Sequence, residues 1–231
     1  MTLRRGTLVA LVAGLALAAV PGNSVAAPAA NECNGIPRCI PIAGPWVAVP
    51  AHGEALFSLS CPGGGVVAGT DGLGSTLDVR AYFDGILGSP VAFGRTTHNQ
   101  ALFRAVSAHH RPGYFKPFIG CIPAPSSVAN TISTEVSPIG PPLDYVARSV
   151  NVNPGFQRTI TLSCPNGESL VDSWSATAFD TPRPPPAGLT SAVSVKTRIV
   201  GRRAQLFVTA SEALPSGLRA QVQVGVRCAS A

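Results

Sequence analysis

The composition of this chain of 231 residues argues against a helical protein. Charged residues make up only 12% of it, and 22 prolines with 24 glycines break up the long periodic runs that helices need. Both residue types interrupt regular structure and mark turns, so many short strands and an all-β fold are expected. The formal net charge of +6 is too small to indicate nucleic acid as a partner.

The first 30 residues have the pattern of a signal peptide followed by a spacer. Arg4 and Arg5 precede an apolar run from Leu8 to Val20, and Ser24-Val25-Ala26 is a small-x-small cleavage site. The run is short for a membrane span. We therefore predict an exported protein, secreted or held at the cell envelope, without a transmembrane segment after cleavage. Losing Arg4 and Arg5 would lower its net charge from +6 to about +4.

One short motif occurs twice in the remaining chain. Leu59-Ser60-Cys61-Pro62 returns as Leu162-Ser163-Cys164-Pro165. A second block, Leu102-Phe103 followed by Ser107, returns in the same order as Leu206-Phe207 followed by Ser211. Two matching blocks in one order indicate an internal repeat with a period of about 103 residues, which is one domain per copy rather than a solenoid repeat.

Six cysteines in an exported protein indicate three disulfides, and fifteen pairings are possible. The repeat selects Cys61–Cys121 and Cys164–Cys228, which leaves Cys33–Cys39 to close a small loop. Each of the two long bridges closes about 60 residues and is expected to stabilise its module by roughly 4 kcal/mol.

Alternating apolar residues place these cysteines on strands. Phe57, Leu59 and Cys61 share one strand face. The last strand is the clearest, because three valines and Cys228 alternate with polar residues and a glycine between positions 221 and 228. The pattern predicts half-buried strands from which the cysteines point into a core.

Frequent turn signals divide each copy into six to eight short strands, which predicts two tandem β-sandwich modules. They are immunoglobulin-like only in a loose sense, because Cys228 lies three residues from the end and no strand can follow it. We expect the second module to fold alone. The predicted division is a signal peptide and spacer (1–30), an N-terminal arm with the small disulfide loop (31–45), a first module (46–124), a linker rich in Pro, Ser and Thr (125–142), and a second module (143–231).

The two Cys-Pro turns also suggest a family. Cys61-Pro62-Gly63-Gly64 and Cys164-Pro165-Asn166-Gly167, each with a distant closing cysteine, resemble the Cys-Pro-x-Gly β modules of exported bacterial proteins. Most of those have no known function, so the resemblance implies a disulfide-tied β module and carries over no catalytic residue.

No nucleophile–base set of a known hydrolase type is recognisable in the sequence. There is no Gly-x-Ser-x-Gly turn, phosphate loop or zinc-ligand cysteine pair. We therefore expect no catalytic residue, cofactor or metal. The alternative is a secreted hydrolase with a site in the first module, built around His52 or His109 with Asp71 or Asp84. His109 and His110 are adjacent, so in an extended chain their side chains would point in opposite directions.

Two surface features remain as candidates for binding. A basic cluster near the C-terminus contains Lys196, Arg198, Arg202 and Arg203. It is either a solvated outer face or a patch for an anionic cell-wall polymer or another acidic extracellular partner. A further alternative is a secreted protease inhibitor that presents the Cys33–Cys39 loop with Arg38 as the bait. The favoured expectation is a non-catalytic protein that acts by binding or structurally.

Overall fold

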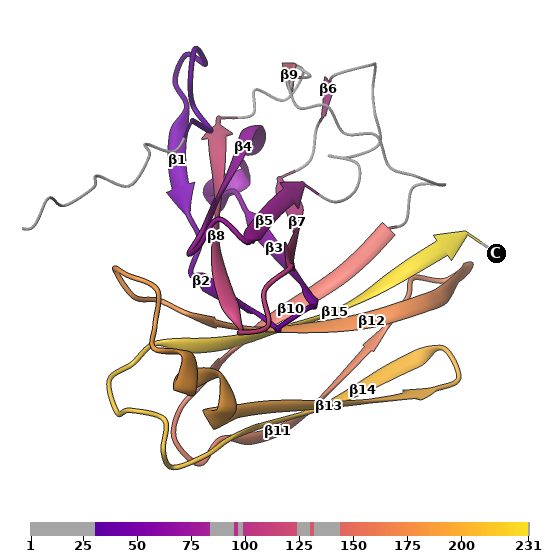
Figure 1. Cartoon of the computed structure of the whole chain (residues 1–231). Coiled ribbons are helices and arrows are strands. Elements are labelled where there is room, and N and C mark those ends of the chain that lie inside the picture. The colour runs from indigo at the N-terminus through magenta and orange to yellow at the C-terminus, as the bar shows by residue number, and fades with distance from the viewer. Residues whose placement is uncertain (1–30, 84–94, 97–98, 124–129, 132–143, 231) are drawn as a thin grey trace, which may run out of the picture.

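The computed structural model describes residues 31–83, 95–96, 99–123, 130–131 and 144–230, and they confirm the all-β prediction (Figure 1). They form fifteen strands and two short 3-10 helices. Among them, no helix has the length and apolar character needed to cross a membrane. The predicted signal peptide (1–30), the candidate carboxylate Asp84 and most of the predicted linker lie outside the described residues.

The strands divide at the linker into an N-terminal and a C-terminal half. The N-terminal half contains β1 (Ile40–Ala43), β2 (Trp46–Val49), β3 (Glu54–Ser60), η1 (Pro62–Gly64), β4 (Val66–Gly74), β5 (Val79–Phe83), β6 (Arg95–Thr96), β7 (Gln100–Ser107), β8 (Gly113–Ile122) and β9 (Asn130–Thr131). The C-terminal half contains β10 (Asp144–Val152), β11 (Gln157–Ser163), β12 (Glu168–Phe179), η2 (Ala187–Ala192), β13 (Val193–Val200), β14 (Arg203–Ala210) and β15 (Ala220–Ser230).

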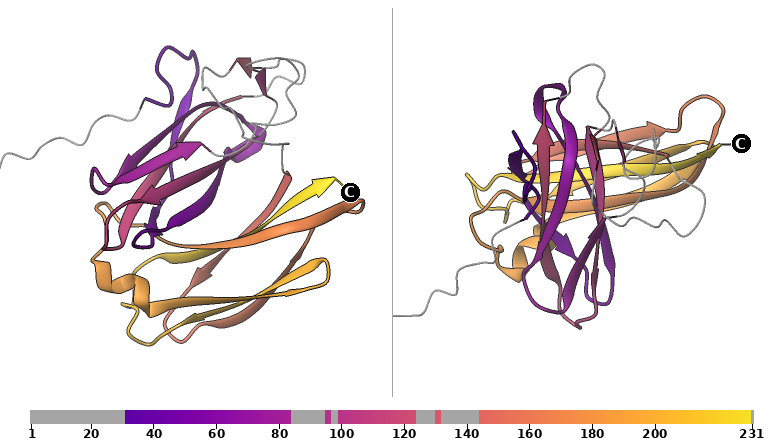
Figure 2. Two further views of the ribbon diagram at one scale, coloured as in Figure 1. Left: turned by 45° about the vertical axis from the view of Figure 1, so that its right-hand side comes forward. Right: turned by 90° about the horizontal axis from the view of Figure 1, so that it is seen from above.

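One seven-stranded antiparallel sheet runs through both halves. Its order is β1-β8-β2-β12-β15-β10, and β4 pairs with the other edge of β8. Two three-stranded sheets, β3-β7-β5 and β11-β14-β13, complete the halves, and β6 pairs with β9. The sheets are curled, and the strands of the N-terminal half cross over those of the C-terminal half (Figure 2). Because the large sheet is continuous, the two separate immunoglobulin-like sandwiches that the sequence predicts are not confirmed in the described residues.

The pairing order is nevertheless the same in both halves. β8 and β15 are the central strands of their parts of the large sheet, and β7 and β14 are central in the small sheets. In each half, the strand that follows the Cys-Pro turn is paired with the closing cysteine at an equivalent residue. Val67 lies opposite Cys121, and Leu170 lies opposite Cys228. A bulge follows immediately in both strands. These shared irregularities match the offset between the repeated sequence motifs.

The three disulfides are those predicted from the repeat. Cys61–Cys121 joins the end of β3 to β8, and Cys164–Cys228 joins the end of β11 to β15, with Cα–Cα distances of 5.6 Å and 5.7 Å. Each therefore ties a small sheet to the large sheet across a core. Cys33–Cys39 closes the short loop before β1.

The expectation that β15 is only half-buried is wrong. Val222, Val224 and Val226 pack into the C-terminal core as the alternation predicts. The opposite face is also covered, because Gln223 is 4% exposed and Gly225 is buried. That face lies beneath the N-terminal half, so alternating polarity here marks an interface between halves and not a solvent boundary.

The hydrophobic cores cross the boundary between the halves. Trp174 and Ala176 of β12 belong to the cluster that is otherwise built by the N-terminal half. Trp46 and Tyr114 of the N-terminal half belong to the other cluster. Moreover, β2 pairs directly with β12. Independent folding of residues 143–231 stays a prediction, and such a fragment would expose Trp174 to water.

The N-terminal arm is part of the fold rather than a free extension. Ile40–Ala43 forms β1 against β8, a strand that the sequence did not predict. The backbone of Glu32 lies so close to Gly69 and Gly120 that a Cβ atom on either glycine would collide with it. The loop closed by Cys33–Cys39 thus packs on the large sheet. Asp71, Gly72 and Gly74 lie within β4, so the glycines of this segment do not mark a turn.

Candidate functional site

The small sheet β11-β14-β13 has an outer face that brings together three of the four basic residues singled out in the sequence. Lys196 and Arg198 lie on β13, where they are paired with Phe207 and Gln205 of β14. Arg203 begins β14 and is paired with Val200. Lys196, Arg198 and Arg203 are exposed. Their neighbours Ala204 and Leu206 point inward and are 0% exposed, so strand alternation places the cations on the outer face.

This outer face carries cations without anions. Its other members on β14 include Gln205, Phe207 and Thr209, and Phe207 is 40% exposed. The facing residues of β11 are hydroxyl and amide side chains, namely Gln157, Thr159, Thr161 and Ser163. Among these described strand residues none is acidic. The face therefore offers cations and neutral hydrogen-bonding groups around one exposed aromatic ring.

Arg202, the fourth residue of the predicted patch, lies apart from that face. It lies in the two-residue turn between β13 and β14, and its guanidinium donates to the backbone carbonyl oxygens of Pro165 and Glu168. Those carbonyls belong to the turn that follows Cys164. Arg202 thus fastens the hairpin to the second Cys-Pro turn.

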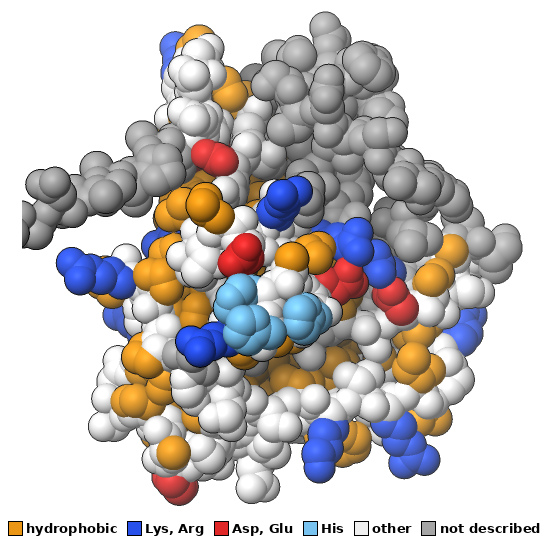
Figure 3. Space-filling view, viewed as in Figure 1, with side chains coloured by type: hydrophobic (Ala, Val, Ile, Leu, Met, Phe, Trp, Pro, Cys, Tyr) orange, Lys and Arg blue, Asp and Glu red, His pale blue; other side chains and the backbone are white. Residues whose placement is uncertain are grey.

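Histidine side chains of the described residues gather on one face, at the centre of Figure 3, with acidic and basic side chains around them. The rings of His109 and His110 stack, with centroids 4.1 Å apart. The expectation that they point in opposite directions is wrong, because they lie in the turn between β7 and β8 and not on a strand. The N–H of His52 donates to the carbonyl oxygen of His109 at 3.0 Å, which brings the two segments together.

The carboxylate proposed as a partner of these histidines has other contacts. Asp71 accepts hydrogen bonds from the backbone N–H groups of Asn31 and Gly72, both at 2.7 Å. No hydrogen bond joins Asp71 to His52 or His109, both of which are described, and Asp84 lies outside the described residues. Within the part of the chain that the structure describes, no cluster of three or more His, Cys, Asp or Glu could hold a metal ion.

The Cys33–Cys39 loop is a compact series of turns. Arg38 is exposed and has a φ of 58°, in the left-handed region. A protease binds its substrate as an extended strand, and a left-handed residue at the bait position does not have that conformation. The geometry of this loop therefore does not supply the extended segment that the inhibitor alternative requires.

The most strongly built polar site is one that the sequence reasoning missed. Gln223 of β15 holds the backbone of Ser58 on β3: its Oε1 accepts from the Ser58 N–H at 2.5 Å, and its Nε2 donates to the Ser58 carbonyl at 2.8 Å. The same Nε2 donates to Ser149 Oγ at 3.0 Å. The side-chain amide thus takes the place of a neighbouring strand at the free edge of β3. No local signal marked this site, because Gln223 occupies one of the regular polar positions of an alternating strand.

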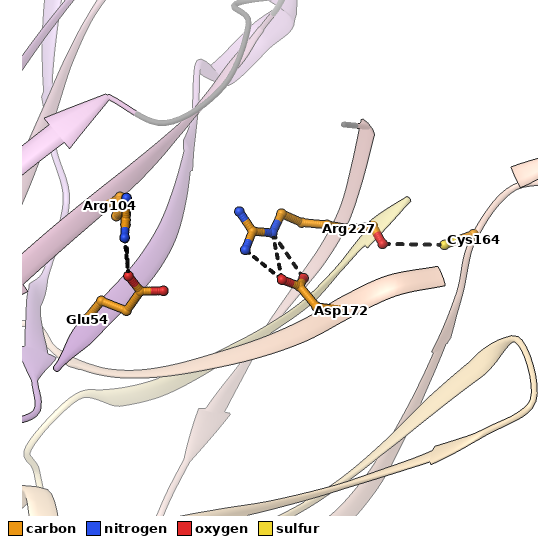
Figure 4. Close-up of polar contacts among 5 residues, drawn as sticks. All are labelled: Glu54, Arg104, Cys164, Asp172 and Arg227. Atoms are coloured by element: carbon orange, nitrogen blue, oxygen red, sulfur yellow. Dashed lines mark hydrogen bonds and ion pairs between the residues drawn. The ribbon is translucent and has the colours of Figure 1, made fainter. Parts of the chain in front are cut away.

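Further polar contacts surround this junction. The hydroxyls of Ser58 and Tyr145 lie 3.3 Å apart, and burial raises the pKa of Tyr145 although its hydrogen bond to Ser58 opposes the rise. Figure 4 shows the ion pair between Arg227 on β15 and Asp172 on β12. Its shortest N–O distance is 2.6 Å. In the same figure the Sγ of Cys164 lies 3.9 Å from the carbonyl oxygen of Arg227.

Comparison with known protein families found no match for this chain, and comparison with curated proteins found none either.

Proposed function

We propose that the protein is an exported, non-catalytic binding protein that holds an anionic extracellular polymer on the outer face of β11-β14-β13. The observation that carries this proposal is the absence of acidic residues from a described sheet face that presents Lys196, Arg198 and Arg203. Cations on one face attract and orient a polyanion, and each contributes over a short range at physiological salt.

The spacing of the cations suits a linear polymer. Residues two apart on a strand are separated by roughly 7 Å, and adjacent strands by about 4.8 Å. Lys196, Arg198 and Arg203 therefore form a line of charges at intervals of less than about 10 Å, with Phe207 beside Lys196. A chain of acidic sugars could contact two or three of them at once, while the hydroxyl and amide side chains bind its neutral groups.

Three disulfides support the extracellular part of the proposal, because such bonds persist in oxidising compartments. The apolar segment from Leu8 to Val20 supports export. We also propose that the halves are copies of one Cys-Pro-x-Gly module, immunoglobulin-like in the loose sense. Their equal pairing order, equal bulges and equal disulfide positions support that origin.

The proposal is tested with the protein from residue 31 onward, produced in an oxidising compartment and bound to immobilised polygalacturonate or to neutral dextran. We expect binding to the anionic polymer alone, and weaker binding as salt is raised. Replacing Lys196, Arg198 and Arg203 by Gln should weaken it by about tenfold or more.

The matched control removes the same charge elsewhere, with Arg38, Arg80 and Arg111 replaced by Gln. All three are exposed and lie in the N-terminal half, so this variant should lose no more than about twofold in affinity. Equal losses in both variants, or equal binding to dextran, would overturn the assignment of the site.

A further inference from the structure

A polar groove runs along the junction between the two halves. Two adjoining cavities form it, of about 590 Å³ and about 250 Å³, and Pro45 and Gln221 line both. The larger cavity extends past Asn151, and the smaller one reaches Gln223 and Gln100. Together they have the dimensions of a site for a small or segmental ligand.

At the floor of the groove, one side-chain amide already holds a peptide group of the chain itself. Gln223 is 4% exposed, and its side-chain amide holds both the N–H and the carbonyl of Ser58. A carboxamide offers one acceptor and two donors, so it matches a backbone peptide unit in both directions. Here it binds the otherwise unpaired edge of an extended strand.

The neighbouring residues on the same face also carry side-chain amides, but these amides bind no backbone group among the described residues. Ser149 is paired with Gln223, and two residues further along β10 and β15 Asn151 is paired with Gln221. Residues two apart share a strand face, so Gln221 and Asn151 point to the same side as Gln223. Within the described residues, neither side chain makes a hydrogen bond. They form a second, open copy of the amide site.

The groove is almost without charge. Its charged lining residues are Asp180 and Arg219, which lie 3.7 Å apart as an ion pair. A charged ligand would find no unpaired counter-ion among the described lining residues. The aromatic residue that lines the cavities is Phe57, which is 2% exposed and offers no open ring face. A sugar would therefore lack the stacking surface on which its apolar face usually rests.

We propose that this groove binds an extended, uncharged peptide segment of an extracellular partner, whose backbone is held by Gln221 and Asn151 as Ser58 is held by Gln223. The inference does not depend on the basic face of β11-β14-β13, which lies on a different sheet. It assigns the protein a second, neutral binding site between its halves.

The test uses an array of N-acetylated, C-amidated hexapeptides composed of Ala, Ser, Thr, Gly and Val, followed by titration of the strongest binder in solution. Replacing Gln221 and Asn151 together by Ala should weaken binding by about tenfold or more, because two backbone contacts are lost. Replacing Gln157 and Gln205 by Ala removes amides from the outer face of the other sheet and should leave binding unchanged.

Both double variants should keep the thermal midpoint of the parent protein, since all four side chains lie at the surface or half-buried. Peptides in which a central residue is Asp or Lys should bind more weakly than the parent peptide. The proposal is overturned if no peptide of the array binds, if the Gln221 and Asn151 variant binds as well as the control, or if maltohexaose occupies the groove in place of peptide.

Discussion

The two halves differ in the strand that pairs with one edge of their central strand. In the C-terminal half, β10 runs for nine residues along β15 without a break. In the N-terminal half, the matching edge of β8 is divided into β1 and β2, with Gly44 and Pro45 between them. Pro45 has no N–H to donate to a ladder, and Gly44 lies against Pro117, where an added Cβ would be 2.7 Å from the ring.

The strand after this break joins the halves. β2 pairs with β8 from Val47 to Val49, and on its other edge Trp46 and Val47 pair with Phe179 and Ala178 of β12. Val47 is therefore bonded to strands of both halves. The difference shows that β2, and no strand in the matching position of the C-terminal half, carries the large sheet from one half into the other.

A second difference is the use of the central strand. β15 is buried on both faces and presents Gln223 and Gly225 to the other half. Gly225 leaves room for the ring of Trp174, which lies where a side chain at 225 would have to be. At the junction, the C-terminal half thus contributes both the central strand β15 and the ring of Trp174.

Removing a long disulfide should have the largest effect and should test whether the halves are equivalent. Replacing Cys164 and Cys228 by Ala is expected to cost about 2–5 kcal/mol, and so is replacing Cys61 and Cys121. Removing Cys33–Cys39 should cost less, because it closes a much shorter loop. Urea unfolding under oxidising conditions measures all three. Equal costs for all three pairs would contradict the comparison.

The next effect should come from the junction itself. Gln223→Leu would leave the buried N–H and carbonyl of Ser58 without a partner, which is expected to cost about 2–4 kcal/mol. Gln205→Leu on the outer face of β14 is the control and should change the free energy of unfolding by less than about 0.5 kcal/mol. If the two variants are equally stable, Gln223 does not hold the halves together.

The break between β1 and β2 can be tested by adding one methyl group at position 44. Gly44→Ala would press a Cβ against the ring of Pro117 and should cost about 1–3 kcal/mol. Gly188→Ala is a suitable control, because an added Cβ there has no neighbour within 4 Å. Thermal unfolding compares the two variants, and a Gly44 variant as stable as the Gly188 variant would show that the close contact is not needed.

The smallest expected effect is a dependence on alkaline pH. Burial raises the pKa of Tyr145 above its ordinary value of 10.0, and burial raises that of Tyr114 as well. The folded protein then keeps protons that the unfolded chain loses, so stability should fall as the pH rises past that value. Urea midpoints at about pH 9 and about pH 11 should differ less in the variant with Tyr145→Phe and Tyr114→Phe. An unchanged difference would show that other groups cause it.

The sequence was sufficient for the features that local pattern determines. Alternation and the repeated Leu-Ser-Cys-Pro motif predicted most strands and all three disulfides. It was insufficient where tertiary contacts decide. Nothing local distinguishes a polar strand face in water from one beneath another half, so the role of Gln223 was missed. The stacked histidines and the separate position of Arg202 likewise depend on turns whose geometry the sequence does not specify.

Because the two cores share side chains across the boundary, we expect the halves of the full chain to unfold as one unit even if residues 143–231 can fold alone, and the two tryptophans can test this directly. Trp46 comes from the N-terminal half but packs in the second core, while Trp174 comes from the C-terminal half but packs in the first. Trp46→Phe and Trp174→Phe each leave one tryptophan in the chain. In both variants we predict that urea unfolding followed by fluorescence coincides with unfolding followed by circular dichroism, in a single transition. A plateau, or a fluorescence midpoint separated from the circular dichroism midpoint, would show two independent modules and contradict the account.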